Sequence, residues 1–109
     1  MAKATYWQRG ESLDFVNAES TVIEANTIKV LGTRIGVVGT DVNPGEKGSI
    51  HVTGVYEIQK TGTGKIDMGA AVYYDGTGIT TTASGNTPAG YAAATAEADA
   101  EVILVKLLG

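Results

Sequence analysis

The clearest strand signal in the chain is the stretch SIHVTGVYEIQ at residues 49–59. Its even-numbered residues, 50–58, read Ile, Val, Gly, Tyr and Ile, whereas most of its odd-numbered residues are polar. Alternation with a period of two places successive side chains on opposite faces of a β-strand. The stretch therefore predicts a long strand over residues 48–59 with one buried face.

Short β-favouring runs lie on both sides of this stretch, and turn signals separate them roughly every 8 to 12 residues. The runs fall at residues 14–16, 21–24, 27–31, 34–38, 71–75, 78–82, 90–95 and 101–108. The turn signals include Gly32, Asn43-Pro44-Gly45 and Asp75-Gly76, in a chain that holds 15 glycines. This spacing predicts an all-β protein: a compact antiparallel β-barrel or jelly-roll-like sandwich of about eight short strands.

Two runs near the C-terminus allow more than one interpretation. The run at residues 101–108 is apolar on both faces, which indicates a central strand or, slightly favoured, a strand covered by a neighbouring subunit. The alanine-rich segment 92–100 is a possible helix, but it lacks large apolar residues at helical spacing. We therefore expect strand, turn and strand there.

A faint internal repeat joins the two halves of the chain. Residues 23–30 (IEANTIKV) resemble residues 66–73 (IDMGAAVY), and each segment precedes a short strand and a Pro/Gly turn, Pro44-Gly45 in one half and Pro88-Ala89-Gly90 in the other. Two similar halves are compatible with a pseudo-symmetric β-fold.

The length of 109 residues and mass of 11.2 kDa predict one domain, at residues 13–109, preceded by an N-terminal arm at residues 1–12. The arm carries Tyr6, Trp7 and Arg9. Large aromatics and arginine are the residue types that dominate binding hot spots, so these three are the candidate partner-binding residues. The alternative is that they pack back on their own domain.

The composition argues against several classes of function. A net charge of −4 and a pI near 4.8 argue against nucleic acid as a partner. Cysteine is absent and His51 is the single histidine, which removes the usual metal and thiol chemistry. We also find neither a secretory signal nor an apolar stretch long enough to span a membrane, so we expect a soluble protein made in a cytoplasm, with no membrane partner.

Each motif that suggests a nucleotide, metal or catalytic site is incomplete. The stretch TGTGKI at residues 61–66 lacks both the first glycine of a phosphate-binding loop and the Ser or Thr that follows its lysine. Residues 41–46 contain a proline that does not fit a calcium loop. Ser49 and His51 have no evident carboxylate to orient the imidazole. We therefore expect no enzymatic activity, no cofactor and no bound metal.

The order of segments resembles a known family. The resemblance rests on the aromatic arm, on PGEKGSIHVTGVYE at residues 44–57, on GAAVYYD at 69–75, on GNTPAGY at 85–91 and on VILVKL at 102–107. In this order they are similar to small tailed-phage and prophage proteins described as capsid cement or decoration proteins. Some members carry a label as phage recombinases, which the incomplete nucleotide loop and negative charge of this chain contradict.

The resemblance implies a structural virion protein that binds the outside of the phage head and stabilises contacts between major capsid subunits. It implies synthesis in the cytoplasm of the bacterial host, the major capsid protein as partner, and a homo-oligomer, which we expect to be a dimer or trimer. The alternative is a virion-associated module that binds carbohydrate or a cell surface through a stacking platform of Tyr73, Tyr74 and Tyr91. A small enzyme or recombination factor ranks third.

Overall fold

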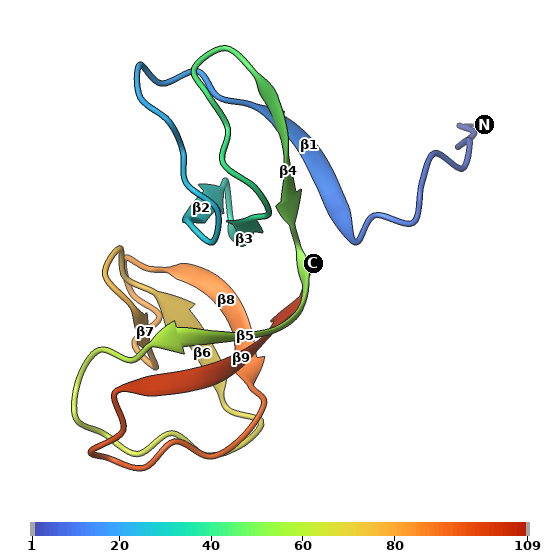
Figure 1. The fold of residues 1–109 in the computed structure, drawn as a ribbon. Helices are drawn as coiled ribbons and strands as arrows, with labels where there is room; N and C mark the ends of the chain where they lie inside the picture. Colours follow the sequence, from blue (N-terminus) through green and yellow to red (C-terminus); the bar gives the residue numbers. More distant parts are fainter. Residues whose placement is uncertain (1, 109) are drawn as a thin grey trace.

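The structure, a computed structural model, describes residues 2–108 and contains nine β-strands and no helix within them. The predicted all-β class is therefore confirmed. Figure 1 shows the strands. They are β1 (Ser12–Val16), β2 (Ile28–Leu31), β3 (Arg34–Val38), β4 (Lys47–His51), β5 (Thr53–Gln59), β6 (Ala71–Tyr74), β7 (Ile79–Thr80), β8 (Thr87–Ala92) and β9 (Val102–Leu108).

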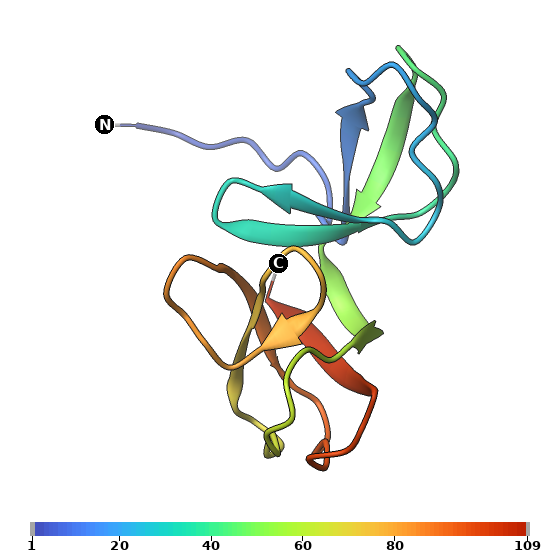
Figure 2. The same cartoon turned by 90° about the vertical axis from the view of Figure 1, so that its left-hand side faces the viewer.

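The strands form two antiparallel sheets, one from each half of the chain. The first has the order β1-β4-β3-β2, and the second has the order β5-β9-β8-β6-β7. Figures 1 and 2 show the sheets as two halves stacked end to end, with the β2-β3 hairpin of the first lying over the second. No closed barrel is found among the described residues, so the predicted barrel or jelly-roll remains a prediction. Residues 2–108 also contain no helix able to cross a bilayer.

The predicted single strand over residues 48–59 is wrong in one respect, because it is two strands in different sheets. β4 ends at His51 and β5 begins at Thr53, so Val52 alone connects the two halves. The alternation still holds across the junction, with Ile50, Val52 and Ile58 all buried. An extended chain keeps its side-chain period when it leaves one ladder for another, so the pattern alone does not reveal the change of sheet.

Two other expectations need correction. The run at residues 21–24 contributes only an isolated bridge between Ile23 and Val42. The run at 90–95 is displaced, because β8 starts at Thr87 and ends at Ala92. The bulge beside Pro88 makes a proline tolerable within this strand. Residues 92–100 form no helix, as expected, and they contain an isolated bridge at Ala96 followed by a turn.

The two halves are structural repeats. We call residues 12–51 the N-terminal repeat and residues 53–108 the C-terminal repeat. The strands correspond one to one in their positions within the sheets: β1 to β5, β4 to β9, β3 to β8 and β2 to β6. Only β7 has no counterpart, because it is an extra strand that follows β6 in the chain and lies beyond β6 at the edge of the sheet.

The cross-strand registers also correspond. The equivalent pairs are Ser12–His51 with Val55–Lys106, Val16–Lys47 with Gln59–Val102, and Lys29–Gly36 with Val72–Gly90. Isolated bridges also match, Ile23–Val42 in one repeat and Ile66–Ala96 in the other. The similarity of residues 23–30 to 66–73 therefore marks equivalent positions. The two prolines do not correspond, because Pro44 lies in a turn and Pro88 lies inside β8.

A tight turn follows each of the four bridged residues. In each, a backbone N–H donates to the carbonyl three residues earlier, from Thr27 to Glu24, Glu46 to Asn43, Ala70 to Asp67 and Ala100 to Glu97. The third residue has a positive φ in three of these turns: 71° at Asn26, 80° at Gly45 and 91° at Gly69. Glycine and asparagine adopt this conformation at the lowest cost, so the residue types at these positions are explained by the turn.

Each repeat has an equivalent core centre. In the N-terminal repeat Ile23, Val38 and Val42 cluster with Phe15, and the matching residues Ile66, Ala92, Ala96 and Ile58 lie in the core of the C-terminal repeat. The second core is much larger, and it includes Ile35 and Val37 from β3 of the N-terminal repeat. The repeats are therefore joined by hydrophobic packing as well as by the chain at Val52.

Candidate functional site

The N-terminal arm is the first candidate for binding a partner. The described part of the arm has no strand before Ser12, and Tyr6 and Trp7 expose 79% and 88% of their surface. Arg9 is also exposed. Figures 1 and 2 show the arm extending away from both sheets. The three predicted residues thus lie on a segment that presents them to the surroundings, and Tyr6 and Trp7 do not pack back on the domain.

The base of the arm is held at the junction of the two repeats. The Val52 N–H donates to the Glu11 carbonyl at 3.0 Å, and the Gln8 side chain donates to the Ser12 carbonyl at 3.3 Å. Gly10 has a φ of 80°, a conformation that suits glycine and redirects the chain just before β1. The arm therefore departs from a fixed point, although its aromatic residues are exposed.

The second candidate is the outer surface of the second sheet. Val55, Tyr91, Leu104 and Leu108 lie on β5, β8 and β9, and each exposes 39–58% of its surface. The register places Val55 and Tyr91 on opposite sides of Lys106, and it places Leu104 beside Glu57. We call Val55, Tyr91, Leu104 and Leu108 the apolar face. Its side chains point away from Ile103, Val105 and Leu107, which are buried beneath the same sheet.

The apolar face bears on the two interpretations of the run at residues 101–108. β9 is an inner strand of its sheet, between β5 and β8, so its central position is confirmed, whereas its cover by a neighbouring subunit stays a prediction. Its second face is nonetheless uncovered in the single chain, with Val102 and Leu104 exposed by 44% and 41%. The sequence alone did not place Val55 and Tyr91 on the same surface as Leu104, because that placement depends on which strands flank β9.

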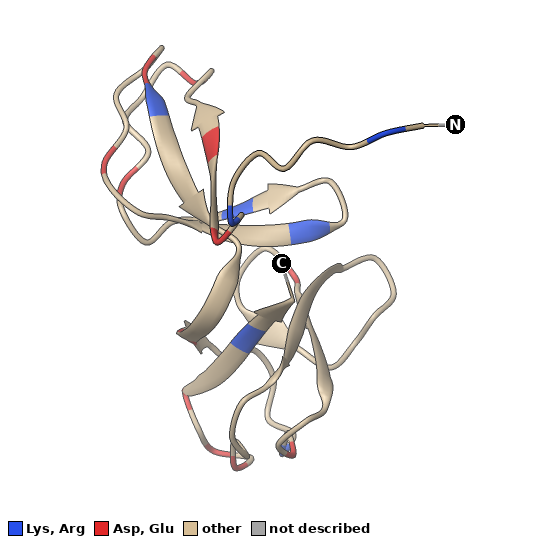
Figure 3. Ribbon diagram, turned by 90° about the vertical axis from the view of Figure 1, so that its right-hand side faces the viewer, with Lys and Arg blue, Asp and Glu red and all other residues tan. Residues whose placement is uncertain are grey.

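Charge is distributed unevenly around these surfaces. Among the acidic residues only Asp14 and Glu57 lie in strands, and the others lie in the arm, loops and turns. Figure 3 shows this distribution, with red concentrated at the loops and blue on the arm and several strands. Lys106 is the one charged residue of β9, and its Nζ donates to the Leu107 carbonyl at 3.0 Å. The apolar face therefore carries one basic residue, Lys106, and one acidic residue, Glu57, whereas most acidic residues lie at the loop ends.

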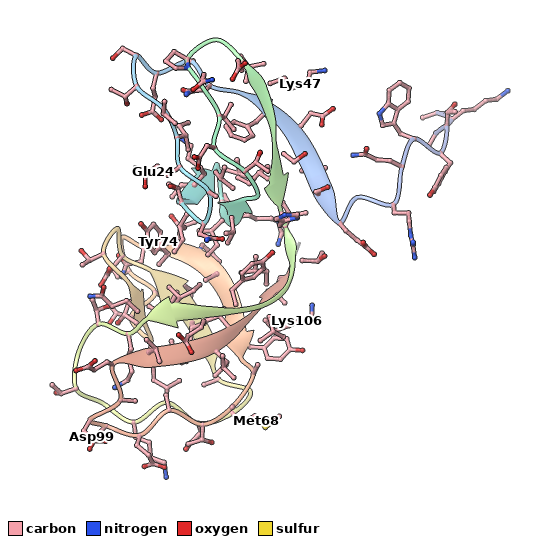
Figure 4. The ribbon with its side chains drawn as sticks, viewed as in Figure 1. Glu24, Lys47, Met68, Tyr74, Asp99 and Lys106 are labelled. Carbon is pink, nitrogen blue, oxygen red and sulfur yellow. The ribbon has the colours of Figure 1, made fainter. Side chains whose placement is uncertain are left out.

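The tyrosines of the alternative carbohydrate module do not share one surface. Tyr73 and Tyr74 are neighbours in β6 and so point to opposite faces of the sheet. Tyr74 packs against the core, and its hydroxyl donates to the Gly76 carbonyl at 3.1 Å. Figure 4 shows Tyr74 where the two repeats meet, whereas Tyr91 is exposed on the apolar face. The three rings therefore do not form a single platform.

The motifs rejected from the sequence lie in ordinary structural settings. Lys65 of the glycine-rich segment lies 3.9 Å from the Asp67 carboxylate, as a surface ion pair. Within residues 2–108 there is no group of three His, Cys, Asp or Glu side chains positioned to hold a metal ion. The pKa of Asp75 is held below its usual value, chiefly by the Gly78 N–H and then by the Thr61 hydroxyl and the Thr77 N–H. These bonds close the turn between β6 and β7.

Comparison with known proteins identifies the class of protein to which this fold and these surfaces belong. The chain matches the family model described as phage cement protein over residues 7–107, nearly its whole length, and it therefore belongs to that family. No curated protein and no solved structure matches the chain. Family membership indicates a structural role in the phage capsid and fits a protein that is not an enzyme.

Proposed function

We propose that this chain is a decoration protein that binds the outside of the phage head and stabilises contacts between neighbouring major capsid subunits. The observation that carries the proposal is the family match over residues 7–107. The protein is made in the cytoplasm of the bacterial host and becomes part of the virion surface. It needs no cofactor for this role, because the role consists of binding alone.

The exposed arm supports this proposal. Tyr6 and Trp7 offer large, rigid apolar surfaces that their own domain leaves mostly exposed, and Arg9 adds a donor for carboxylates. Ordering a free arm opposes binding, since each immobilised side chain loses rotamer freedom. Many symmetry-related copies on one shell offset this cost, because each additional attachment is favoured by a high effective concentration.

Binding to heads is the direct test. Purified protein is mixed with undecorated heads of the phage or prophage that encodes it, and co-sedimentation is measured together with the resistance of the heads to heat and low salt. We expect stoichiometric co-sedimentation and more resistant heads. Protein that stays in the supernatant at every ratio would overturn the proposal.

The arm is tested separately. Deletion of residues 2–9 removes no strand, so the fold should persist while binding to heads weakens. Trp7→Ala should reduce binding by about 2 kcal/mol or more if Trp7 is a hot spot. Met68→Ala, at a side chain exposed by 69% in a distant turn, is the matched control and should leave binding unchanged. Equal binding by the deletion variant and the parent would exclude the arm as the attachment site.

A further inference from the structure

The two repeats pack on one another through different surfaces. Ile35 and Val37 belong to the outer face of the first sheet, because Val38, next to Val37 in β3, points into the N-terminal core. Ile28 shares this face, because it pairs with Val37 across the ladder. Ile35 and Val37 nevertheless lie in the core cluster of the C-terminal repeat, and Ile28 packs against it. The outer face of one repeat thus covers the inner side of the other.

The covered inner side involves β8, the strand packed closest to β3, together with β5 and β6. A cleft of about 400 Å³ at the contact is lined by Ile28 and Val37 from one repeat and by Tyr56, Ile58 and Tyr74 from the other. Figure 4 shows Tyr74 directed toward this junction. Because the two repeats have one fold but contribute unlike surfaces, their contact is head-to-tail.

A head-to-tail contact between two repeats leaves two surfaces of a single chain without a partner: one outer face and one inner side. The unused outer face lies on the C-terminal repeat, where the registers place Ala71, Pro88 and Tyr91 at the positions of Ile28, Ile35 and Val37. All three are exposed, and Tyr91 belongs to the apolar face. The outer face of the N-terminal repeat is therefore buried, whereas the equivalent outer face of the C-terminal repeat is apolar but exposed.

The unused inner side lies on the N-terminal repeat. Leu13, Phe15 and Leu31 occupy the positions of Tyr56, Ile58 and Tyr74. Leu13 is 41% exposed, and Phe15 is half-buried whereas its counterpart Ile58 is only 7% exposed. The core of this repeat is also small, because it contains only residues of its own repeat, whereas the core of the C-terminal repeat also includes Ile35 and Val37.

We propose that a second copy of this chain supplies the missing contact. The outer face of the C-terminal repeat, centred on Tyr91, packs on the inner side of the N-terminal repeat of the next copy, at Leu13 and Leu31. Repetition of this contact closes a ring of two or three copies, in which every repeat covers its neighbour as the first covers the second within one chain. The occupant is this chain because the chain already contains one example of the same contact between equivalent surfaces.

Engineered cysteines test the contact, because the chain has no cysteine of its own. Tyr91 and Leu31 correspond to Val37 and Tyr74, which line one cleft within the chain. A mixture of Tyr91→Cys and Leu31→Cys proteins should form a disulfide-linked dimer on mild oxidation, whereas neither protein alone should do so. Efficient dimer formation by Tyr91→Cys alone would overturn the proposal, because it indicates that like faces meet.

Sedimentation velocity provides a second test, made without capsids so that its outcome is independent of head binding. The parent protein should be a discrete dimer or trimer, and Tyr91→Asp and Leu13→Asp should each be monomeric. Their mixture should recover dimers joined by one intact contact. Met68→Asp is the exposed control and should remain oligomeric. A monomeric parent, an oligomeric Leu13→Asp protein with native circular dichroism, or open filaments would each contradict the closed ring.

Discussion

The N-terminal and C-terminal repeats share strand order and registers but fill their cores differently. At the centre, Phe15, Val38 and Val42 of the first repeat are replaced by Ile58, Ala92 and Ala96 in the second. The smaller alanines are accompanied by Ile79 of the extra strand and by Ile35 and Val37 from the other repeat. The two repeats therefore share their turns and strand registers, whereas the side chains that fill each core come from different segments of the chain.

The buried polar residues show the same contrast. Asn17 and Lys60 follow β1 and β5 at equivalent positions, and both are buried. Asn17 Nδ2 donates to the carbonyls of Thr21 and Val42, both at 2.9 Å, and its Oδ1 accepts from the Glu19 N–H at 2.8 Å. Lys60 Nζ donates to the carbonyls of Glu97 and Ala98 at 3.3 and 3.1 Å. Different side chains thus tie equivalent strand ends to neighbouring loops.

The largest effect is expected at a pair of equivalent glycines. A Cβ on Gly90 would overlap the Lys106 carbonyl oxygen, and the φ of 146° disfavours any other residue. Gly90→Ala should therefore lower the free energy of unfolding by about 4 kcal/mol or more. At Gly36 an added Cβ meets Cγ1 of the Ile50 side chain at 2.6 Å and the His51 carbonyl oxygen only at 3.1 Å, and the φ is not positive, so Gly36→Ala should cost less, about 1–3 kcal/mol.

Denaturant unfolding measures both glycine variants. Gly64→Ala is the control, because its φ is not positive and an added Cβ meets nothing within 4 Å. It should change stability by less than about 0.5 kcal/mol. Equal losses at Gly36 and Gly90 would show that the β8 bulge does not impose a tighter backbone contact than its counterpart in β3.

An intermediate effect is expected at the buried polar pair. Asn17→Ala leaves the Val42 carbonyl and other groups without their partners, and it should cost about 2–3 kcal/mol. Lys60→Met keeps the apolar stem and exposes two carbonyls of a surface turn to water, so it should cost only about 1 kcal/mol. Thermal and denaturant unfolding compare the two. A larger loss for Lys60→Met would mean that the ammonium, rather than the stem, holds the C-terminal turn.

The smallest effect concerns the extra strand β7. Because hydrogen bonds to its carboxylate keep the pKa of Asp75 below 3.8, its charged form stabilises the folded chain at neutral pH. That contribution is present above the unfolded-state pKa and is lost as the pH falls through the lower folded-state pKa. Asp75→Asn should therefore lower the melting temperature slightly at neutral pH, and the difference from the parent should shrink in acid.

Melting curves from neutral pH to below 3.8 measure this difference. The control is Asp67→Asn, whose carboxylate lies on the surface 3.9 Å from Lys65. A constant difference between Asp75→Asn and the parent across the whole range would show that the charge of Asp75 does not stabilise the turn.

Much of the fold follows from local patterns in the sequence. The alternation around Ile50 and Ile58 predicts extended chain and its buried face, and turn residues such as Gly45 and Gly69 predict where strands end. The similarity of residues 23–30 to 66–73 marks the repeat. The aromatic arm is visible as well, since Trp7 precedes any strand pattern. These features depend on residues that are close together in the sequence, so they can be predicted without knowledge of the tertiary contacts.

The arrangement of the repeats depended on the tertiary structure. Nothing local distinguishes Val52 from its neighbours, because a strand that changes sheet keeps the same side-chain alternation. Nor does alternation show that Val37 is buried by the other repeat while its counterpart Tyr91 is exposed. The amino-acid sequence by itself determined the strands, the turns and the repeat; only the packing of one repeat on the other decided which apolar faces are covered, because burial depends on contacts between residues distant in the chain.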